Sequence, residues 1–275
     1  MYSRVYVEIT NQCNRTCTFC PGTERERKFL TLEEFSVITQ KLQGITKYLY
    51  LHVMGEPLVH PLLPEFIRYA TTRGFKVILT TNGTLLSKRG EQLIEAGVYK
   101  INISLHSFEN GTRDEQREYI KDCIRFADQA SKEGVLVILR LWNEGYDEGR
   151  NDETVELLKK YFTEEWVPDA RGARIRSKLH LEYGTRFAWP DRELDELGDE
   201  VFCYGLKDHF GILSNGTVIP CCLDREGVIS LGNIFTDSLQ EILSSDRANR
   251  ITEGFRKRQA VEELCKKCGY ARRFQ

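Results

Sequence analysis

The segment Cys13-Asn-Arg-Thr-Cys17-Thr-Phe-Cys20 follows directly after Arg4–Thr10, a run with the alternation of a β-strand. Three thiolates at this spacing can ligate three irons of a 4Fe–4S cube and leave the fourth iron without a protein ligand. A structural zinc site takes four ligands, usually in C-x2-C pairs, which a lone triplet matches poorly. The spacing therefore predicts an iron–sulfur cluster with one open iron that a further molecule can occupy.

Strand-like and helix-like segments alternate around this triplet through the first two-thirds of the chain. Thr31 begins one helical stretch as a capping box with Glu34. The alternation predicts the α/β class, with a parallel sheet curved into a partial (β/α)6 TIM-like barrel whose chemistry gathers at the carboxyl ends of the strands. The expected strands are Arg4–Thr10, Tyr48–Met54, Lys76–Thr81, Lys100–Leu105, Val135–Trp142 and Lys178–Tyr183. The expected helices are Thr31–Leu42, Leu62–Arg73, Leu86–Ala96, Arg113–Lys132 and Asp152–Phe162.

The pattern changes after about residue 200. Phe210–Leu213 and Thr217–Ile219 flank Asn215-Gly216, a turn pair that predicts a β-hairpin because both residues tolerate positive φ. A helical pattern over Ser238–Leu243 and further helix lead to a terminal cysteine pair. We expect a barrel over residues 1–190 and a small hairpin-plus-helix domain over residues 191–275.

Composition narrows the broad class of protein. The 275 residues carry a formal net charge of −2, so nothing indicates a nucleic-acid partner. No apolar run reaches the ~18 residues of a membrane span, and the N-terminus lacks the features of a signal peptide, so we expect a cytoplasmic protein. Nine cysteines in a reducing compartment favour metal or redox chemistry over disulfides.

The first motif resembles the signature of the radical S-adenosylmethionine (SAM) superfamily, C-x3-C-x-aromatic-C, with Phe19 in the aromatic place. The resemblance implies that Cys13, Cys17 and Cys20 hold the cluster and that SAM chelates its open iron. Met54-Gly55-Glu56-Pro57, at the end of the second expected strand, resembles the family's GGE motif with its first glycine replaced by methionine. The family's glutamate and nearby carbonyls accept hydrogen bonds from the SAM amino group.

Polar residues at later strand ends also occupy positions where the family contacts SAM. The resemblance implies that Ser104 binds the ribose and that Arg140 and Asn143 hold the carboxylate and ribose of SAM. An arginine in an apolar strand needs an anionic partner, and a carboxylate offers it two oxygens. The implied SAM-binding residues are Phe19, Gly55, Glu56, Pro57, Asn82, Ser104, Arg140 and Asn143.

A second cysteine set has the spacing C-x12-G-x4-C followed by C-x2-C. It resembles the C-terminal cluster-binding extensions called SPASM and twitch domains. Because only seven residues follow the last cysteine, we expect the shorter twitch form with one auxiliary 4Fe–4S cluster. Tetrahedral zinc is the alternative for the same ligands. The expected ligands are Cys203, Cys221, Cys265 and Cys268, whereas Cys222, on the opposite face of the same strand, and Cys123 in a helix are expected to be buried bystanders.

The resemblance implies a chemistry. SAM is cleaved to a 5′-deoxyadenosyl radical, with an electron from a donor such as flavodoxin or ferredoxin, and the radical takes a substrate hydrogen. An auxiliary cluster ligated at every iron then predicts a two-electron oxidation, with the cluster accepting an electron. A base must remove a proton, and Asp224 and His106 are the candidates.

Size and layout are nearest to the 2-deoxy-scyllo-inosamine dehydrogenases, which favours a small-molecule dehydrogenase. A peptide or protein maturase and a radical epimerase are alternatives; the early position of Cys13 leaves no room for a leader-binding domain and tilts the expectation towards a small molecule. A protein that only binds zinc at both cysteine sets is the least favoured alternative.

Overall fold

The structure is a computed structural model that describes residues 1–274. The chain forms two compact units that interleave along the sequence. One, here called the terminal unit, contains Met1–Gln12, Pro21–Gly55 and the chain from Phe187 onward. The other, the central unit, contains Cys13–Cys20 and Glu56–Arg186. The two cysteine sets therefore fall in different units. The division expected from the sequence, at residue 190, stays a prediction.

The central unit is built on parallel strands that follow one another in the order β3, β4, β5 and β8. A hairpin of β6 and β7 continues this part of the sheet by antiparallel pairing with β8. The strands are β3 (Lys76–Thr81), β4 (Lys100–Ser104), β5 (Leu136–Glu144), β6 (Val167–Asp169), β7 (Gly172–Arg176) and β8 (Leu179–Thr185). The helices are α2 (Leu63–Thr71), α3 (Leu86–Glu95), α4 (Arg113–Lys132) and α5 (Arg150–Tyr161), with short 3-10 turns at Pro57–Val59 and Leu105–Ser107.

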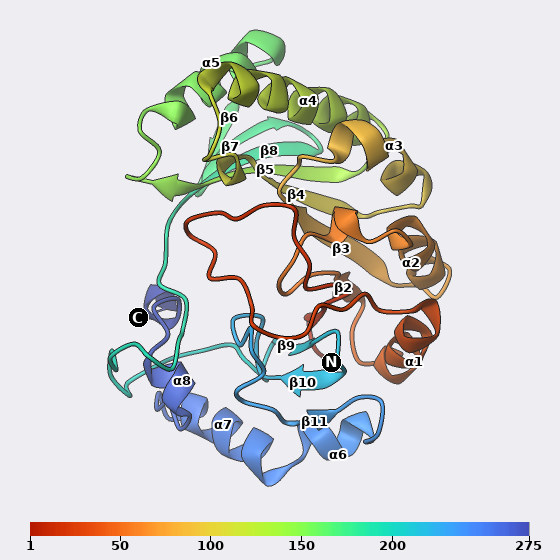
Figure 1. Cartoon of the computed structure of the whole chain (residues 1–275), viewed down its shortest axis with the longest axis vertical. Helices are drawn as coiled ribbons and strands as arrows, with labels where there is room; N and C mark the ends of the chain where they lie inside the picture. Colours follow the sequence, from red (N-terminus) through yellow and green to blue (C-terminus); the bar gives the residue numbers. More distant parts are fainter. Residues whose placement is uncertain (275) are drawn as a thin grey trace. The chain divides into compact units, whose positions relative to one another are not determined.

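Helices of the central unit cover one side of these strands, as Figure 1 shows for α3, α4 and α5. The longest, α4, begins at a capping box in which Thr112 and Glu115 bond to each other's backbone N–H groups. Its buried stripe, which includes Ile120, Ile124 and Ala127, packs onto β5 and β8. This arrangement leaves the carboxyl ends of the strands to carry polar side chains.

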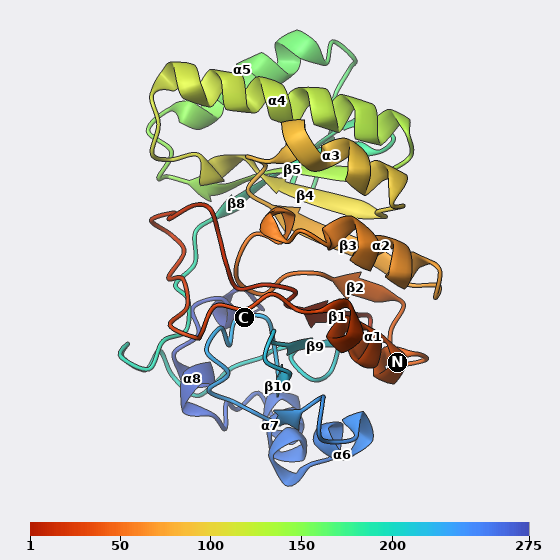
Figure 2. The same ribbon diagram turned by 45° about the vertical axis from the view of Figure 1, so that its right-hand side comes forward.

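In the terminal unit β1 pairs with β2 on one side and β9 on the other, both in parallel. Strand β9 then pairs with β10, and β10 with β11, in antiparallel fashion. The strands are β1 (Arg4–Val7), β2 (Tyr48–Tyr50), β9 (His209–Ile212), β10 (Thr217–Ile219) and β11 (Gly232–Asn233). The helices are α1 (Leu32–Leu42), α6 (Leu239–Leu243), α7 (Asp246–Arg256) and α8 (Glu263–Lys266), followed by a 3-10 turn at Ala271–Phe274. In Figure 2, α6 and α7 lie beside β10 and β11 at the foot of this unit.

The six strands expected before residue 190 and the C-terminal hairpin are present, and the α/β class is confirmed. The strands differ from expectation in several places. The hairpin of β6 and β7 was not predicted, because its strands are short and largely exposed and show no apolar alternation. Cys221 and Cys222 do not lie on a strand, since β10 ends at Ile219, Cys221 is in a bend and Cys222 is in a turn. No helix within residues 1–274 has the length and apolar character needed to cross a membrane.

Candidate active site

The loop with the first cysteine triplet is tied to the carboxyl ends of β3 and β4 inside the central unit. Asn14 accepts a hydrogen bond from Asn82 Nδ2 at 2.9 Å and donates one to Thr84 Oγ1 at 2.9 Å. Asn82 Nδ2 also lies 3.9 Å from Cys13 Sγ. Further along the loop, Cys17 Sγ approaches the Ser107 carbonyl at 3.5 Å. The predicted ligand loop is thereby placed at the strand ends where the sequence analysis expected it.

Glu109 holds the middle of this loop and was not predicted as a site residue. Its Oε2 accepts hydrogen bonds from the Thr18 backbone N–H at 2.9 Å and from the Thr18 hydroxyl at 2.7 Å. Its Oε1 pairs with Arg186 at 2.6 Å, and the Arg186 guanidinium lies 5.5 Å from the centre of the Phe19 ring. No spacing in the sequence joins these residues, because Glu109 follows Thr18 by 91 positions.

The three thiols share one electrostatic environment. Burial, the Glu109 carboxylate and the thiols of Cys20 and Cys13 raise the pKa of Cys17 to about 11. Burial likewise raises the pKa of Cys13. A metal centre removes this penalty, since thiol ligands bind as thiolates to a cationic group. These crowded thiols are a donor set that fits an iron–sulfur cluster.

Glu56 organises the turn that follows β3. It is fully buried, and its carboxylate accepts hydrogen bonds from Thr81 Oγ1 at 2.7 Å, the Asn82 N–H at 2.6 Å and the Leu58 N–H at 3.0 Å. Burial raises the pKa of Glu56 to about 7, against these stabilising bonds. Pro57 is buried at the start of the 3-10 turn that Glu56 caps. The glutamate thus fixes Asn82, and its contact with SAM stays a prediction.

The backbone around Gly55, in the terminal unit, leaves no room for a side chain at this position. Its φ is +78°, and a Cβ atom there would lie 2.6 Å from the Thr10 carbonyl oxygen and 2.7 Å from that of Gln12. The preceding Met54 donates its backbone N–H to Glu8 Oε2 at 3.1 Å. The motif therefore tolerates methionine in the first position but not a side chain in the second.

His106 packs against the cluster loop. The centre of its ring lies 5.0 Å from that of Phe19. Its Nδ1 is 3.1 Å from the Arg140 carbonyl oxygen and 3.3 Å from the backbone nitrogen of Trp142. Burial lowers the pKa of His106 to about 4, so the ring is neutral at pH 7. These contacts orient Phe19. The role of His106 as a base stays a prediction.

The remaining predicted SAM contacts lie along neighbouring strands. Ser104 and Arg140 are register partners on β4 and β5. Arg140 Nε lies 3.5 Å from Glu182 Oε2, and its guanidinium is 4.5 Å from the centre of the Trp142 ring. Asn143, buried at the end of β5, accepts a hydrogen bond from Asn151 at 3.0 Å. The strand ends thus bring Ser104 and Arg140 together, and their contacts with SAM stay predictions.

The second cysteine set gathers inside the terminal unit. Burial and the thiols of Cys203, Cys222, Cys265 and Cys268 raise the pKa of Cys221 well above its usual value. Within residues 1–274, no group of three or more His, Cys, Asp or Glu side chains is arranged to hold a metal ion. A cube of iron and sulfide takes one thiolate at each corner and so spreads its ligands further than a single ion does. Four partly buried thiols that raise one another's pKa fit such a cube.

Two residues beside this set have other partners. Asp224 is buried, and its two oxygens accept the N–H groups of Val228 and Ile229 at 2.8 Å each. Burial raises the pKa of Asp224 above its usual value. The Cys222 thiol is hydrogen-bonded to the Tyr6 hydroxyl, so it is a polar partner in the interior and not only a small hydrophobe.

Comparison with known proteins decides the family. The radical SAM superfamily model matches residues 7–164, more than half of the chain. The chain belongs to the radical SAM superfamily. The SPASM iron–sulfur cluster-binding domain matches residues 203–269, which include the four gathered cysteines. The cofactors that these two matches imply are SAM, a 4Fe–4S cluster and an auxiliary iron–sulfur centre.

Curated relatives match part of this chain. A GTP 3′,8-cyclase of Aquifex aeolicus is 39% identical over 202 residues, which are 66% of this chain and 58% of that protein. An AdoMet-dependent heme synthase of Methanosarcina barkeri is 34% identical over 114 residues, 40% of this chain and 33% of the relative. The chain thus spans between a third and about three-fifths of the length of these relatives.

Solved structures share its fold over nearly the whole chain. BtrN in complex with AdoMet and 2-DOIA superposes with a TM-score of 0.62 at 21% identity, covering 98% of this chain and 93% of BtrN. Streptococcus suis SuiB bound to precursor peptide SuiA gives a TM-score of 0.57 at 18% identity, with 98% and 70% covered. These matches confirm the predicted partial barrel with its cluster-binding C-terminal domain.

Proposed function

We propose that this radical SAM enzyme dehydrogenates a small molecule and that the auxiliary centre accepts an electron from the substrate. When bound, the first cluster and SAM together supply a 5′-deoxyadenosyl radical that removes one hydrogen atom. The substrate must then lose one further electron and one proton to complete a two-electron oxidation. The observation behind the proposal is the gathering of four partly buried cysteines, enough to ligate every iron of the auxiliary centre.

Residues of the central unit would bind and orient SAM. The thiols of Cys13, Cys17 and Cys20 would hold the first cluster on a loop fixed by Asn82 and Glu109. Arg140 supplies a cation for the SAM carboxylate, and Ser104 lies beside it in register for the ribose. The rings of Phe19 and His106 pack against each other with their centres 5.0 Å apart on this side of the loop.

Two residues are proposed for the proton. Burial raises the pKa of Asp224 above its usual value, and Asp224 follows the auxiliary ligand Cys221 by three residues. His106 lies against Phe19 of the first cysteine loop, and burial lowers its pKa to about 4. Because the proposed electron acceptor is the auxiliary centre, we favour Asp224. Asp224→Asn should retain SAM cleavage and lose substrate oxidation by at least about tenfold.

The experiment separates SAM cleavage from substrate oxidation. Anaerobically reconstituted enzyme receives a strong reductant, SAM and an aminocyclitol such as 2-DOIA, and 5′-deoxyadenosine and oxidised product are quantified. Cys265→Ala/Cys268→Ala should still cleave SAM but yield little oxidised product. Cys123→Ala, which removes a buried thiol from α4, is the matched control and should do both. Equal oxidation by the double variant, or deuterium returned from deoxyadenosine to an isomerised substrate, overturns the proposal.

The names of the relatives favour a second candidate, cyclisation of GTP. Several curated relatives named GTP 3′,8-cyclase are 28–39% identical to the chain. A peptide is the third substrate class, because SuiB binds a precursor peptide. Parallel incubations with GTP and with a peptide distinguish these candidates. Consumption of GTP without oxidation of any alcohol would replace the dehydrogenase proposal with a cyclase.

A further inference from the structure

The segments before and after the loop that carries Cys13, Cys17 and Cys20 are joined by hydrogen bonds in the terminal unit. Asn11 donates to the Glu26 carbonyl at 2.8 Å and accepts the Lys28 N–H at 2.9 Å. Thr10 Oγ1 donates to the Lys28 carbonyl at 2.9 Å. These bonds hold the two ends of the loop together. The segment after Cys20 is fixed by other contacts.

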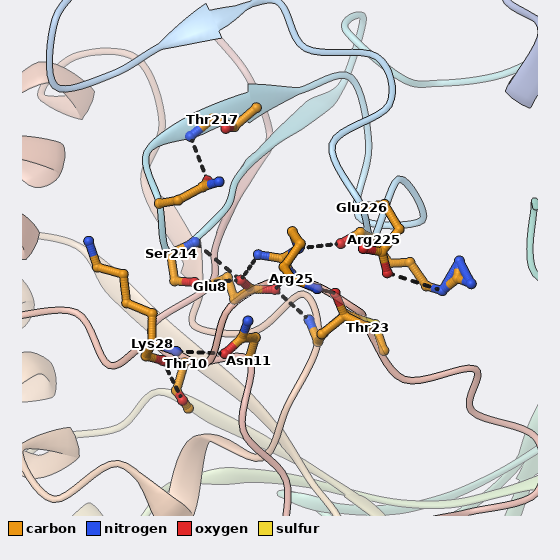
Figure 3. Close-up of polar contacts among 12 residues, drawn as sticks. Glu8, Thr10, Asn11, Thr23, Arg25, Lys28, Ser214, Thr217, Arg225 and Glu226 are labelled. Carbon is orange, nitrogen blue, oxygen red and sulfur yellow. Dashed lines mark hydrogen bonds and ion pairs between the residues drawn. The ribbon is translucent and has the colours of Figure 1, made fainter.

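A buried ion pair fixes that segment. The guanidinium of Arg25 donates to both oxygens of Glu8 at 2.7 Å each, and the two side chains are 11% and 0% exposed. Glu8 also accepts the N–H of Met54 at 3.1 Å, and the N–H and hydroxyl of Ser214 at 3.1 and 2.9 Å. Figure 3 shows Arg25, Glu8 and Ser214 converging on this point. A charge removed from water is tolerated here because every lone pair has a partner.

Arg25 and Arg225 each donate a hydrogen bond to the chain segment that contains the other. Arg25 Nε donates to the carbonyl of Arg225 at 2.7 Å, and Arg225 Nε donates to the carbonyl of Gly22 at 3.1 Å. Glu226 Oε1 accepts the N–H of Glu24 at 3.3 Å. Gly22 stands two residues after Cys20, and Arg225 four residues after Cys221. The segments that leave the two cysteine sets are thus linked in both directions.

We propose that Arg25 and Arg225 form a clasp through which the segments 22–28 and 222–229 order each other, so that occupancy of one cysteine set favours occupancy of the other. A cluster bound at Cys221 stiffens the segment that follows it. The clasp then presents Gly22 and Arg25 with fixed partners, which reduces the entropy that the other loop loses on binding its own cluster. Thermodynamic linkage makes this effect equal in both directions. The proposal rests on the cluster ligands and not on the reaction proposed above.

Hydrogen exchange of the iron-loaded protein tests the clasp directly. Cys265→Ala/Cys268→Ala empties the auxiliary site without touching either clasped segment, and Cys13→Ala/Cys17→Ala empties the other site. Emptying the auxiliary site should speed amide exchange in residues 22–28 by about tenfold, and emptying the first site should do the same for residues 222–229. In an Arg225→Ala background both segments should already exchange fast, and emptying either site should change little.

Controls make the outcome decisive. Arg176→Ala removes a half-buried arginine that binds Asp128 in the central unit, and it should leave the coupling unchanged. Arg225→Lys serves if the alanine variant loses its circular dichroism spectrum, because lysine keeps the charge near Asp191 but cannot reproduce the Nε bond. Unchanged exchange in residues 22–28 on emptying the auxiliary site, or an equal change with and without Arg225, overturns the proposal. Because no product is measured, the result is independent of the substrate.

Discussion

At the scale of single residues, the Glu56 carboxyl is held between two opposing effects. Complete burial favours its neutral form, and three donated hydrogen bonds favour its charged form. Burial is the larger effect and raises the pKa to about 7. The folded protein therefore keeps a proton on Glu56 that the unfolded chain has already released near pH 4.5.

Replacing Glu56 should change how stability depends on pH. Between pH ~4.5 and ~7 the folded state binds more protons at this site, so the free energy of unfolding falls as pH rises, by up to about 3 kcal/mol. Glu56→Gln lacks this component, so its melting temperature should fall less than that of the wild type between pH 5 and pH 8. Glu118→Gln, on the exposed face of α4, is the control. A larger fall in the Glu56 variant contradicts the assignment.

Adjacent cysteines should differ sharply in iron binding. Cys221 shares its electrostatic field with the other three cysteines of its set, whereas the Cys222 thiol bonds to Tyr6. Cys221→Ala should lose the auxiliary centre, about half of the total iron, while Cys222→Ala should keep it. Iron and sulfide analysis measures both. Equal loss from the two variants would mean that the ligand has been misassigned.

At the scale of elements, the turn between β4 and α4 should control how firmly the first cluster is held. Glu109→Ala removes the acceptor of two bonds from Thr18 and the partner of Arg186. The charge-assisted bonds lost correspond to about tenfold faster release of iron to a chelator. Glu118→Ala, also within the central unit, should release iron at the wild-type rate. Equal rates of iron release from the two variants would show that the turn between β4 and α4 does not act on the cluster loop.

Elements with strong periodicity could be predicted from the sequence, and short ones could not. The bounds of β3, β10 and α4 agree with expectation because apolar pattern and capping residues mark their ends. The second strand was expected to reach Met54 but ends at Tyr50, and the Met54 N–H is donated to the Glu8 carboxylate. Strand β11 has two residues and carries no pattern at all.

At the scale of the whole molecule, two cysteine sets should bind about eight irons per chain. Anaerobic reconstitution followed by iron, sulfide and zinc analysis measures this number. Cys265→Ala/Cys268→Ala should bind about four irons in the first cluster. Cys13→Ala/Cys17→Ala should bind about four irons in the auxiliary centre. Zinc with little iron would contradict both cluster assignments.

The candidate cofactor residues were placed at strand ends from the sequence, whereas the residues that bond to these segments were not predicted. Cys13, Glu56 and Asn82 stand at fixed distances from strand ends, which local patterns reveal. Arg25 and Ser214 both bond to Glu8, from 17 and 206 positions away in the sequence, so only the folded chain brings the three residues together. Glu8 itself gave no signal, because a glutamate at a strand end normally faces water.

The pairing of β1 with β9 joins Arg4–Val7 to His209–Ile212. A ribosome releases the first of these strands long before it makes the second, and domains tend to fold as units during synthesis. The nascent β1 therefore waits with one edge unpaired until three-quarters of the protein has emerged. Premature termination before β9 leaves that edge open, which makes such fragments prone to aggregate and to be degraded.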